Sequence, residues 1–182
     1  MQTAIQEFAT AFTDTAAAIR ADQLGHRTPC EQFTVAELLG HVGQVLASSE
    51  RAARKQPQSD AAAGPATPAE VAEAARRAAA AWAEPAAYQG TTEFGPGEMP
   101  ADFAAAVTLQ ELALHGWDLA RATGQPFGAG EEAAKAVLSV VQQLAGTARA
   151  NGGYGRPVAV PDGAGPFHRA LAASGRNPGW DR

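Results

Sequence analysis

Residues 104–124 (AAAVTLQELALHGWDLARATG) combine a long apolar surface with one narrow polar stripe. Drawn as a helix at about 100° per residue, the segment places four polar side chains within an arc of roughly 80°: Thr108, Glu111, His115 and Asp118. A helix that is apolar nearly all round is typically buried. Because an unpaired buried charge is very costly, this stripe needs a partner. Glu111 and His115 lie one turn apart and can reach the same point, where a divalent cation is the simplest partner.

Hydrophobic periodicity and cap motifs predict further helices. Apolar residues recur at steps of three and four near the N-terminus. Two later segments, Thr34-Val35-Ala36-Glu37 and Thr67-Pro68-Ala69-Glu70, have the threonine and glutamate spacing of a capping box, which indicates a helix start. The predicted helices cover residues 3–20, 34–55, 68–84, 101–124, 129–150 and 166–174.

These helices predict an all-α protein in one domain of residues 1–182. Residues 3–124 are expected to form a four-helix bundle, and residues 129–182 an additional helix and a short C-terminal tail. Two segments rich in proline, glycine or both, 56–66 and 85–100, are predicted to be loops. The second is long enough to suggest a functional loop.

Composition narrows the class of protein. Hydrophobic residues, many of them alanine, make up 46% of the 182 residues, which favours helices. The net charge of −5 argues against a nucleic-acid partner. The single cysteine, Cys30, excludes an intrachain disulfide and fits a reducing cytoplasm. An apolar run of about 18 residues is lacking, so no membrane partner and a cytoplasmic location are expected.

A third candidate ligand lies on another predicted helix. His41 stands beside the apolar stripe of the helix over 34–55, so His41, Glu111 and His115 could meet in the bundle core. Three protein ligands with an open fourth position are typical of a reactive zinc site; nickel or iron(II) would also suit this set. The alternatives are a buried hydrogen-bonded Glu111/His115 pair and a core histidine at position 41.

Other polar residues near this set have more than one interpretation. Asp118 fits a fourth ligand or an acceptor for an imidazole N–H, and equally a salt bridge with Arg121. Cys30 fits a metal ligand, a redox thiol or, the favoured interpretation, a small buried apolar side chain. His26 and His168 are expected to be solvated.

Three segments carry a resemblance to a known family. They are TPCEQFTV (28–35) with LLGHV (38–42), ELALHGWDLARATG (111–124), and the tail segments GRPVAVP (155–161) and SGRNPGW (174–180). The chain resembles the mycothiol-dependent maleylpyruvate isomerase N-terminal family of the DinB-like superfamily, and its tail resembles a subgroup of uncharacterised metal-binding proteins. The family pattern T-P-C-x-G-W departs here at Gln32 and Phe33.

The resemblance implies a four-helix bundle with zinc or a similar divalent ion held by His41, Glu111 and His115. It also implies a low-molecular-weight thiol such as mycothiol, held as a thiolate, which would add to an electrophilic substrate. The expected function is a metal- and thiol-dependent transferase or isomerase. The alternatives are a non-catalytic metal- or ligand-binding module and a metal-dependent hydrolase with Asp118 as base. The substrate and a homodimeric state stay open.

Overall fold

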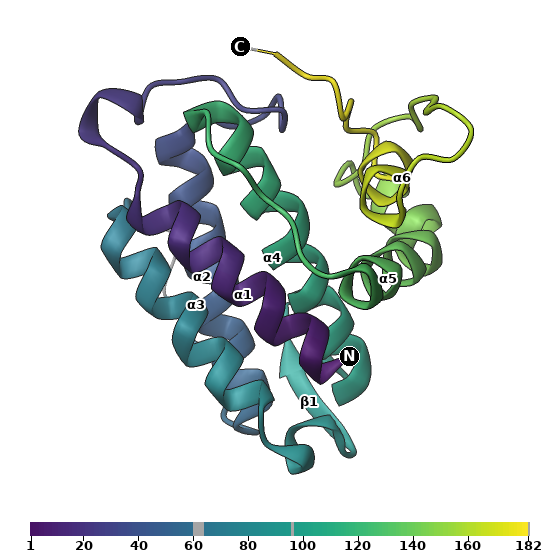
Figure 1. Ribbon diagram of the computed structural model, residues 1–182. Helices are drawn as coiled ribbons and strands as arrows, with labels where there is room; N and C mark the ends of the chain where they lie inside the picture. Colours follow the sequence, from purple (N-terminus) through teal and green to yellow (C-terminus); the bar gives the residue numbers. More distant parts are fainter. Residues whose placement is uncertain (60–63, 96, 182) are drawn as a thin grey trace.

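Four long helices form a bundle, as the sequence predicts (Figure 1). The computed structural model describes residues 1–59, 64–95 and 97–181. The bundle helices are α1 (Gln2–Ala17), α2 (Val35–Ala53), α3 (Pro68–Trp82) and α4 (Ala101–Thr123). A short 3-10 helix, η1 (Ala21–Gln23), lies in the connector between α1 and α2. The all-α class is confirmed, and each predicted bundle helix is found within a few residues of its expected bounds.

The additional helix and the tail lie beside the bundle. Helices α5 (Glu131–Ala150) and α6 (Pro166–Ala173) pack against each other, and α5 also contacts α1 and α4. From α6 the chain runs back over one end of the bundle, toward the connector between α1 and α2 (Figure 1). This return path brings tail residues close to α4.

Local sequence explains where the bundle helices begin and end. Both predicted capping boxes are present: the Thr34 hydroxyl accepts from the Glu37 amide, and Thr67 and Glu70 repeat the arrangement at α3. Helix α4 ends at Gly124, which adopts a left-handed φ of 75°.

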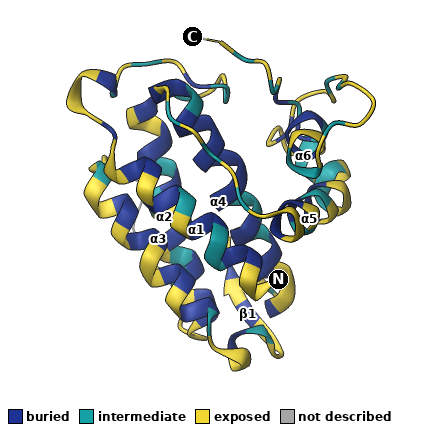
Figure 2. Ribbon diagram, viewed as in Figure 1, coloured by how far each residue is buried: buried dark blue, intermediate teal, exposed yellow. Residues whose placement is uncertain are grey.

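Helix α4 is the most buried helix of the bundle and carries the polar stripe into the interior. Figure 2 shows it as almost entirely buried, whereas α3 and α5 each present an exposed face. Its apolar side chains Leu109, Leu112 and Leu119 are fully inaccessible to solvent. No helix in the described part of the chain is both long and apolar enough to span a membrane.

The prediction that residues 85–100 form a loop is wrong. The segment contains a 3-10 turn, η2 (Pro85–Tyr88), and an antiparallel hairpin of β1 (Thr91–Phe94) and β2 (Gly97–Pro100). In β1 exposed and buried residues alternate, and the buried Thr92 hydroxyl donates to the Ala52 carbonyl at 2.7 Å. This period of two is a strand signal that the glycines and prolines obscured. In the other predicted loop, residues 56–59 and 64–66 are irregular, and 60–63 lie outside the described residues.

Candidate metal centre

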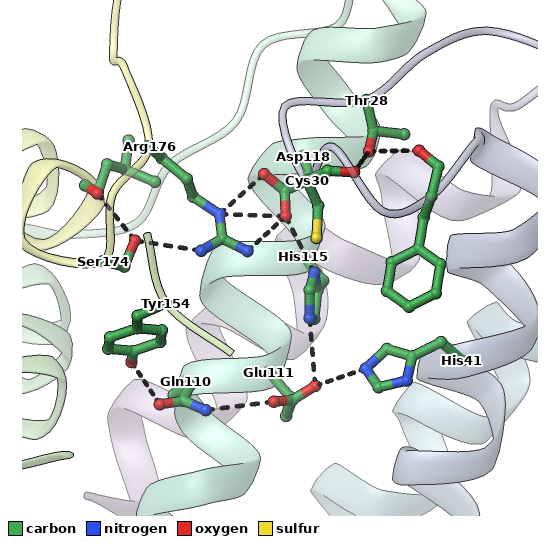
Figure 3. Close-up of polar contacts among 12 residues, drawn as sticks. Thr28, Cys30, His41, Gln110, Glu111, His115, Asp118, Tyr154, Ser174 and Arg176 are labelled. Carbon is green, nitrogen blue, oxygen red and sulfur yellow. Dashed lines mark hydrogen bonds and ion pairs between the residues drawn. The ribbon is translucent and has the colours of Figure 1, made fainter. Parts of the chain in front are cut away.

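Helices α2 and α4 bring the three predicted ligands together (Figure 3). The Nε2 atoms of His41 and His115 each lie 3.5 Å from Oε2 of Glu111. One potential ligand atom from each of the three residues lies within 4.8 Å of the other two. The apolar residues that flank His41 in sequence pack into the core, which turns the histidine toward α4. That this cluster binds a metal ion stays a prediction.

One oxygen of Glu111 has no hydrogen-bond partner among the residues that the structure describes. Glu111 is largely buried, with 13% of its side chain exposed. Its Oε1 accepts a hydrogen bond from Gln110 Nε2 at 3.2 Å, whereas Oε2 is buried and has none. Buried polar atoms are normally satisfied, so an unpartnered carboxylate oxygen between two imidazoles fits the chemistry of a cation site.

The hydrogen bond of Asp118 determines which nitrogen of His115 faces Glu111. Asp118 is fully buried, and its Oδ2 lies 2.9 Å from Nδ1 of His115. An ionised carboxylate can only accept, so Nδ1 carries a hydrogen, and in the neutral imidazole Nε2 then presents a lone pair to Glu111. A lone pair and a carboxylate oxygen that face each other repel, and either a proton on Nε2 or a metal cation between the two atoms relieves this repulsion.

Asp118 does not form the alternative salt bridge with Arg121. Its partner is Arg176 of the tail, whose Nε lies 2.9 Å from Oδ1 and whose Nη2 lies 2.7 Å from Oδ2. The Arg121 guanidinium donates to the Trp180 carbonyl instead. The role of Arg176 is not evident from the sequence, because the SGRNPGW segment that contains it has no periodicity that would locate it in space.

Both acidic groups are held ionised by their neighbours. Burial by itself would raise the pKa of Glu111, but His115 and His41 outweigh it and lower the pKa to about 2. Burial also opposes ionisation of Asp118, and the Arg176 guanidinium, followed by His115, holds the pKa of that carboxyl below its usual range. Both carboxylates are therefore ionised at neutral pH, and the Arg176 guanidinium offsets the charge of Asp118.

The open side of the cluster is formed by His41 and Phe33. The side chain of His41 is 35% exposed, and its ring stacks on Phe33 at a centroid distance of 5.2 Å. Phe33 also lines a groove of about 940 Å³ between the connector that precedes α2 and the end of the tail, whose other lining residues include Arg27 and Trp180.

Cys30 lies on the other side of His115 from Glu111 (Figure 3). Its sulfur is within 4.8 Å of ligand atoms of His115 and Asp118, and the residue is half-buried. Burial, followed by the charge of Asp118, raises the pKa of the Cys30 thiol. The Thr28 hydroxyl fixes this turn through the carbonyls of Cys30 and Phe33, at 2.9 and 2.8 Å.

The two remaining histidines differ from each other. His168 is exposed on α6, as expected. The expectation that His26 is solvated is wrong: His26 is half-buried, and its Nδ1 lies 3.0 Å from the Ala122 carbonyl at the end of α4. This contact ties the connector to α4, which no local pattern could indicate.

Fold and site together define a class: a DinB-like helical bundle that presents a histidine, glutamate and histidine cluster between two of its helices. The model of the mycothiol maleylpyruvate isomerase N-terminal domain matches residues 5–120, which hold the bundle and all three cluster residues. The chain belongs to this family.

The chain is also similar to individual proteins and to solved structures. Two uncharacterized proteins, from two strains of Mycobacterium tuberculosis, are each 33% identical over 144 residues, covering 75% of this chain and 74% of theirs. Crystal structures of the mycothiol-dependent maleylpyruvate isomerase and of a histidine-to-alanine mutant of it share the fold. Their TM-scores are 0.57 and 0.58 at 14% and 12% identity, over 77% of this chain and 67% of those chains.

Proposed function

We propose that the protein is a metal- and thiol-dependent enzyme, an isomerase or transferase that uses a low-molecular-weight thiol of the mycothiol type. The observation that carries the proposal is the unpartnered Oε2 of Glu111, which lies 3.5 Å from two imidazole nitrogens. The family supports the thiol, because its name and the solved structures of similar fold refer to mycothiol.

His41, Glu111 and His115 would hold the divalent cation, and a set of two imidazoles and one carboxylate suits Zn²⁺ best, with Ni²⁺ and Fe²⁺ as alternatives. When bound, the cation supplies a Lewis acid that favours the thiolate form of a coordinated thiol. Asp118 keeps the hydrogen of His115 on Nδ1, so that Nε2 stays free to act as a ligand.

The groove beside the cluster suits the organic part of a thiol and an electrophilic substrate. Its volume of about 940 Å³ lies within the range of small-molecule sites. Phe33 borders the groove and stacks on His41, so the groove is linked to the cluster through this one aromatic ring. The polar and charged side chains around it, including His26, Arg27 and Glu31, would orient a polar ligand. A cytoplasmic location, which the single cysteine favours, would keep such a thiol reduced.

The geometry disfavours the hydrolase alternative. That mechanism needs Asp118 as a free base beside a water molecule. Here Asp118 is fully buried, and both of its oxygens accept hydrogen bonds from Arg176. An ionised carboxylate that is fixed in this way holds a neighbour in place and is a poor proton acceptor.

Metal content tests the first part of the proposal. Protein purified without a metal-affinity column should contain about one equivalent of a divalent ion by mass spectrometry. His115→Ala should lose it, because two remaining ligands leave the shell incomplete. His168→Ala, which removes an exposed histidine of α6, is the matched control and should retain the ion. Wild-type protein that contains less than about a tenth of an equivalent and cannot be reloaded would contradict the proposal.

Thermal shift assays with a panel of thiols test the second part. A thiol that binds should raise the melting temperature of the metal-loaded protein and leave the apoprotein and His115→Ala unchanged, since only the native site binds it. Equal shifts in loaded and apoprotein would contradict a thiol at the metal. No shift with any thiol, in a metal-loaded protein, would favour the non-catalytic module instead.

A further inference from the structure

The C-terminal tail supplies a buried arginine, Arg176, to the side of the candidate metal centre where Asp118 contacts His115. Helix α6 ends in a turn in which Gly175 has a φ of 91° and the Arg176 amide donates to the Leu171 carbonyl at 2.9 Å. A side chain at Gly175 would lie 2.5 Å from the Cα of Gly155, so two glycines let the tail and the segment after α5 touch backbone to backbone. This packing fixes where Arg176 enters the bundle.

The Arg176 guanidinium donates hydrogen bonds through all three of its nitrogens. It is 6% exposed, and its Nε and Nη2 bind both oxygens of Asp118. Its Nη1 donates to the Ser174 hydroxyl at 3.1 Å, and that hydroxyl donates to the Leu171 carbonyl at 2.8 Å. The plane of the Asp118 carboxylate is therefore fixed by a two-pronged contact. Figure 3 shows the chain of contacts from Ser174 through Arg176 and Asp118 to His115 and Glu111.

Stabilisation alone explains this pair poorly. Bringing an arginine and an aspartate out of water costs more than their attraction returns in many proteins, and apolar residues of similar size are often as stable. Here the shared carboxylate oxygen, Oδ2, accepts from Arg176 at 2.7 Å and lies 2.9 Å from the His115 imidazole. The pair thus acts on an imidazole whose other nitrogen faces Glu111.

We propose that Arg176 is a positioning residue of the metal centre, which fixes the ring orientation and tautomer of His115 through Asp118. The purpose of this arrangement rests on the proposed metal site, and its mechanism rests on the contacts among Arg176, Asp118 and His115. Without Arg176 the carboxylate is free to rotate, so its hydrogen bond to Nδ1 weakens and the tautomer with hydrogen on Nδ1 is less strongly preferred. The family model ends at residue 120, so this contribution comes from a segment outside the matched domain.

The tautomer of His115 is the direct readout and needs no metal. Long-range proton–nitrogen NMR spectra of the apoprotein should show hydrogen on Nδ1 of His115 in the wild type and a mixture of tautomers in Arg176→Gln. Arg169→Gln removes an exposed arginine of α6 and is the matched control, expected to match the wild type. A folded Arg176→Gln protein with the wild-type tautomer would overturn the proposal.

Metal affinity is the second readout. Titration of the apoprotein with Zn²⁺ should show a loss of about 10- to 100-fold in Arg176→Gln, the range found when the partner of a metal-bound histidine is removed. Asp118→Asn should lose a similar factor, and adding Arg176→Gln to it should cost less than about twofold more, because both act through one carboxylate. Independent, multiplying losses would indicate a merely structural role and overturn the proposal.

Two further outcomes are distinguishable. If Arg176→Gln does not fold, Arg176→Lys takes its place, because lysine keeps the charge and the buried stem but loses the two-pronged contact. A partial loss of Zn²⁺ affinity is then expected. Unchanged Zn²⁺ affinity together with an unchanged His115 tautomer would overturn the proposal. If the wild type binds no metal, the proposed function fails, whereas the NMR comparison still decides whether Arg176 controls His115.

Discussion

At the scale of single residues, two carboxylates about two turns apart on α4, those of Glu111 and Asp118, have opposite surroundings. Both oxygens of Asp118 accept hydrogen bonds from Arg176, and Oδ2 also lies 2.9 Å from Nδ1 of His115. Glu111 faces two imidazole nitrogens, and one of its buried oxygens has no hydrogen-bond partner in the described part of the chain. A carboxylate whose oxygens are all hydrogen-bonded positions its neighbours, whereas a buried carboxylate oxygen without a hydrogen bond attracts a cation. The two carboxylates are thus suited to different roles in one site.

The thiol of Cys30 should be weakly reactive in the folded protein. Burial, and then the charge of Asp118, raises its pKa, so the thiolate fraction near neutral pH is smaller than in the unfolded chain. Alkylation of the apoprotein by iodoacetamide, followed by mass spectrometry, should be on the order of tenfold slower than in denaturant. The denatured chain is the control, because Cys30 is its single cysteine. Equal or faster alkylation of the folded protein would show an activated thiol instead.

At the scale of elements, α3 illustrates how local sequence fixes a helix start. Thr67 and Glu70 cap the first turn, with the Glu70 carboxylate 2.8 Å from both the Thr67 amide and its hydroxyl. The pattern is complete within four residues and needs no tertiary contact, and for this reason the sequence was sufficient to predict it.

The same capping box predicts a pH effect. The backbone amide of Thr67, followed by its hydroxyl, lowers the pKa of Glu70 in the folded protein. A lowered folded pKa adds stability above the unfolded pKa of about 4.3, and this stability is lost as the pH falls through the folded value. Glu70→Gln should therefore unfold at lower denaturant concentration than the wild type at pH 7, and the difference should shrink below about pH 4. Glu73→Gln, on the same helix but outside the capping box, is the control; a difference that persists at pH 3 contradicts the prediction.

At the scale of the whole molecule, the segment after α4 packs closely on the helix that carries the site. Gly116, next to His115, faces Phe127 and Phe12, and a Cβ there would lie 2.6 Å from Cε2 of Phe127 and 3.1 Å from Cδ2 of Phe12. Phe127 is in turn packed against Phe8 and Phe167. The absence of a side chain at position 116 thus lets the additional helix and tail approach the bundle.

Two glycine substitutions in helices should therefore have opposite effects. Gly116→Ala should lower the free energy of unfolding by about 1–3 kcal/mol, because the added methyl group overpacks a filled site. Gly146→Ala, in α5, meets nothing within 4 Å and should raise it by about 0.5–1 kcal/mol, because alanine is the better helix former. Urea unfolding measures both. A stabilised Gly116→Ala protein would show that the segment after α4 is not packed on the helix as described.

The sequence by itself determined the helices, their caps and the Glu111/His115 pair, because each is encoded within a few neighbouring residues by periodicity or spacing. His41 could be proposed as a partner from its place on a second amphipathic helix, but only the packing of α2 on α4 decided that the three side chains meet. The β1–β2 hairpin was missed because its short strands are confirmed only by burial against α2 and α4. The pairing of Arg176 with Asp118 spans 58 residues. It depends on the path of the tail, and no local pattern encodes such a path.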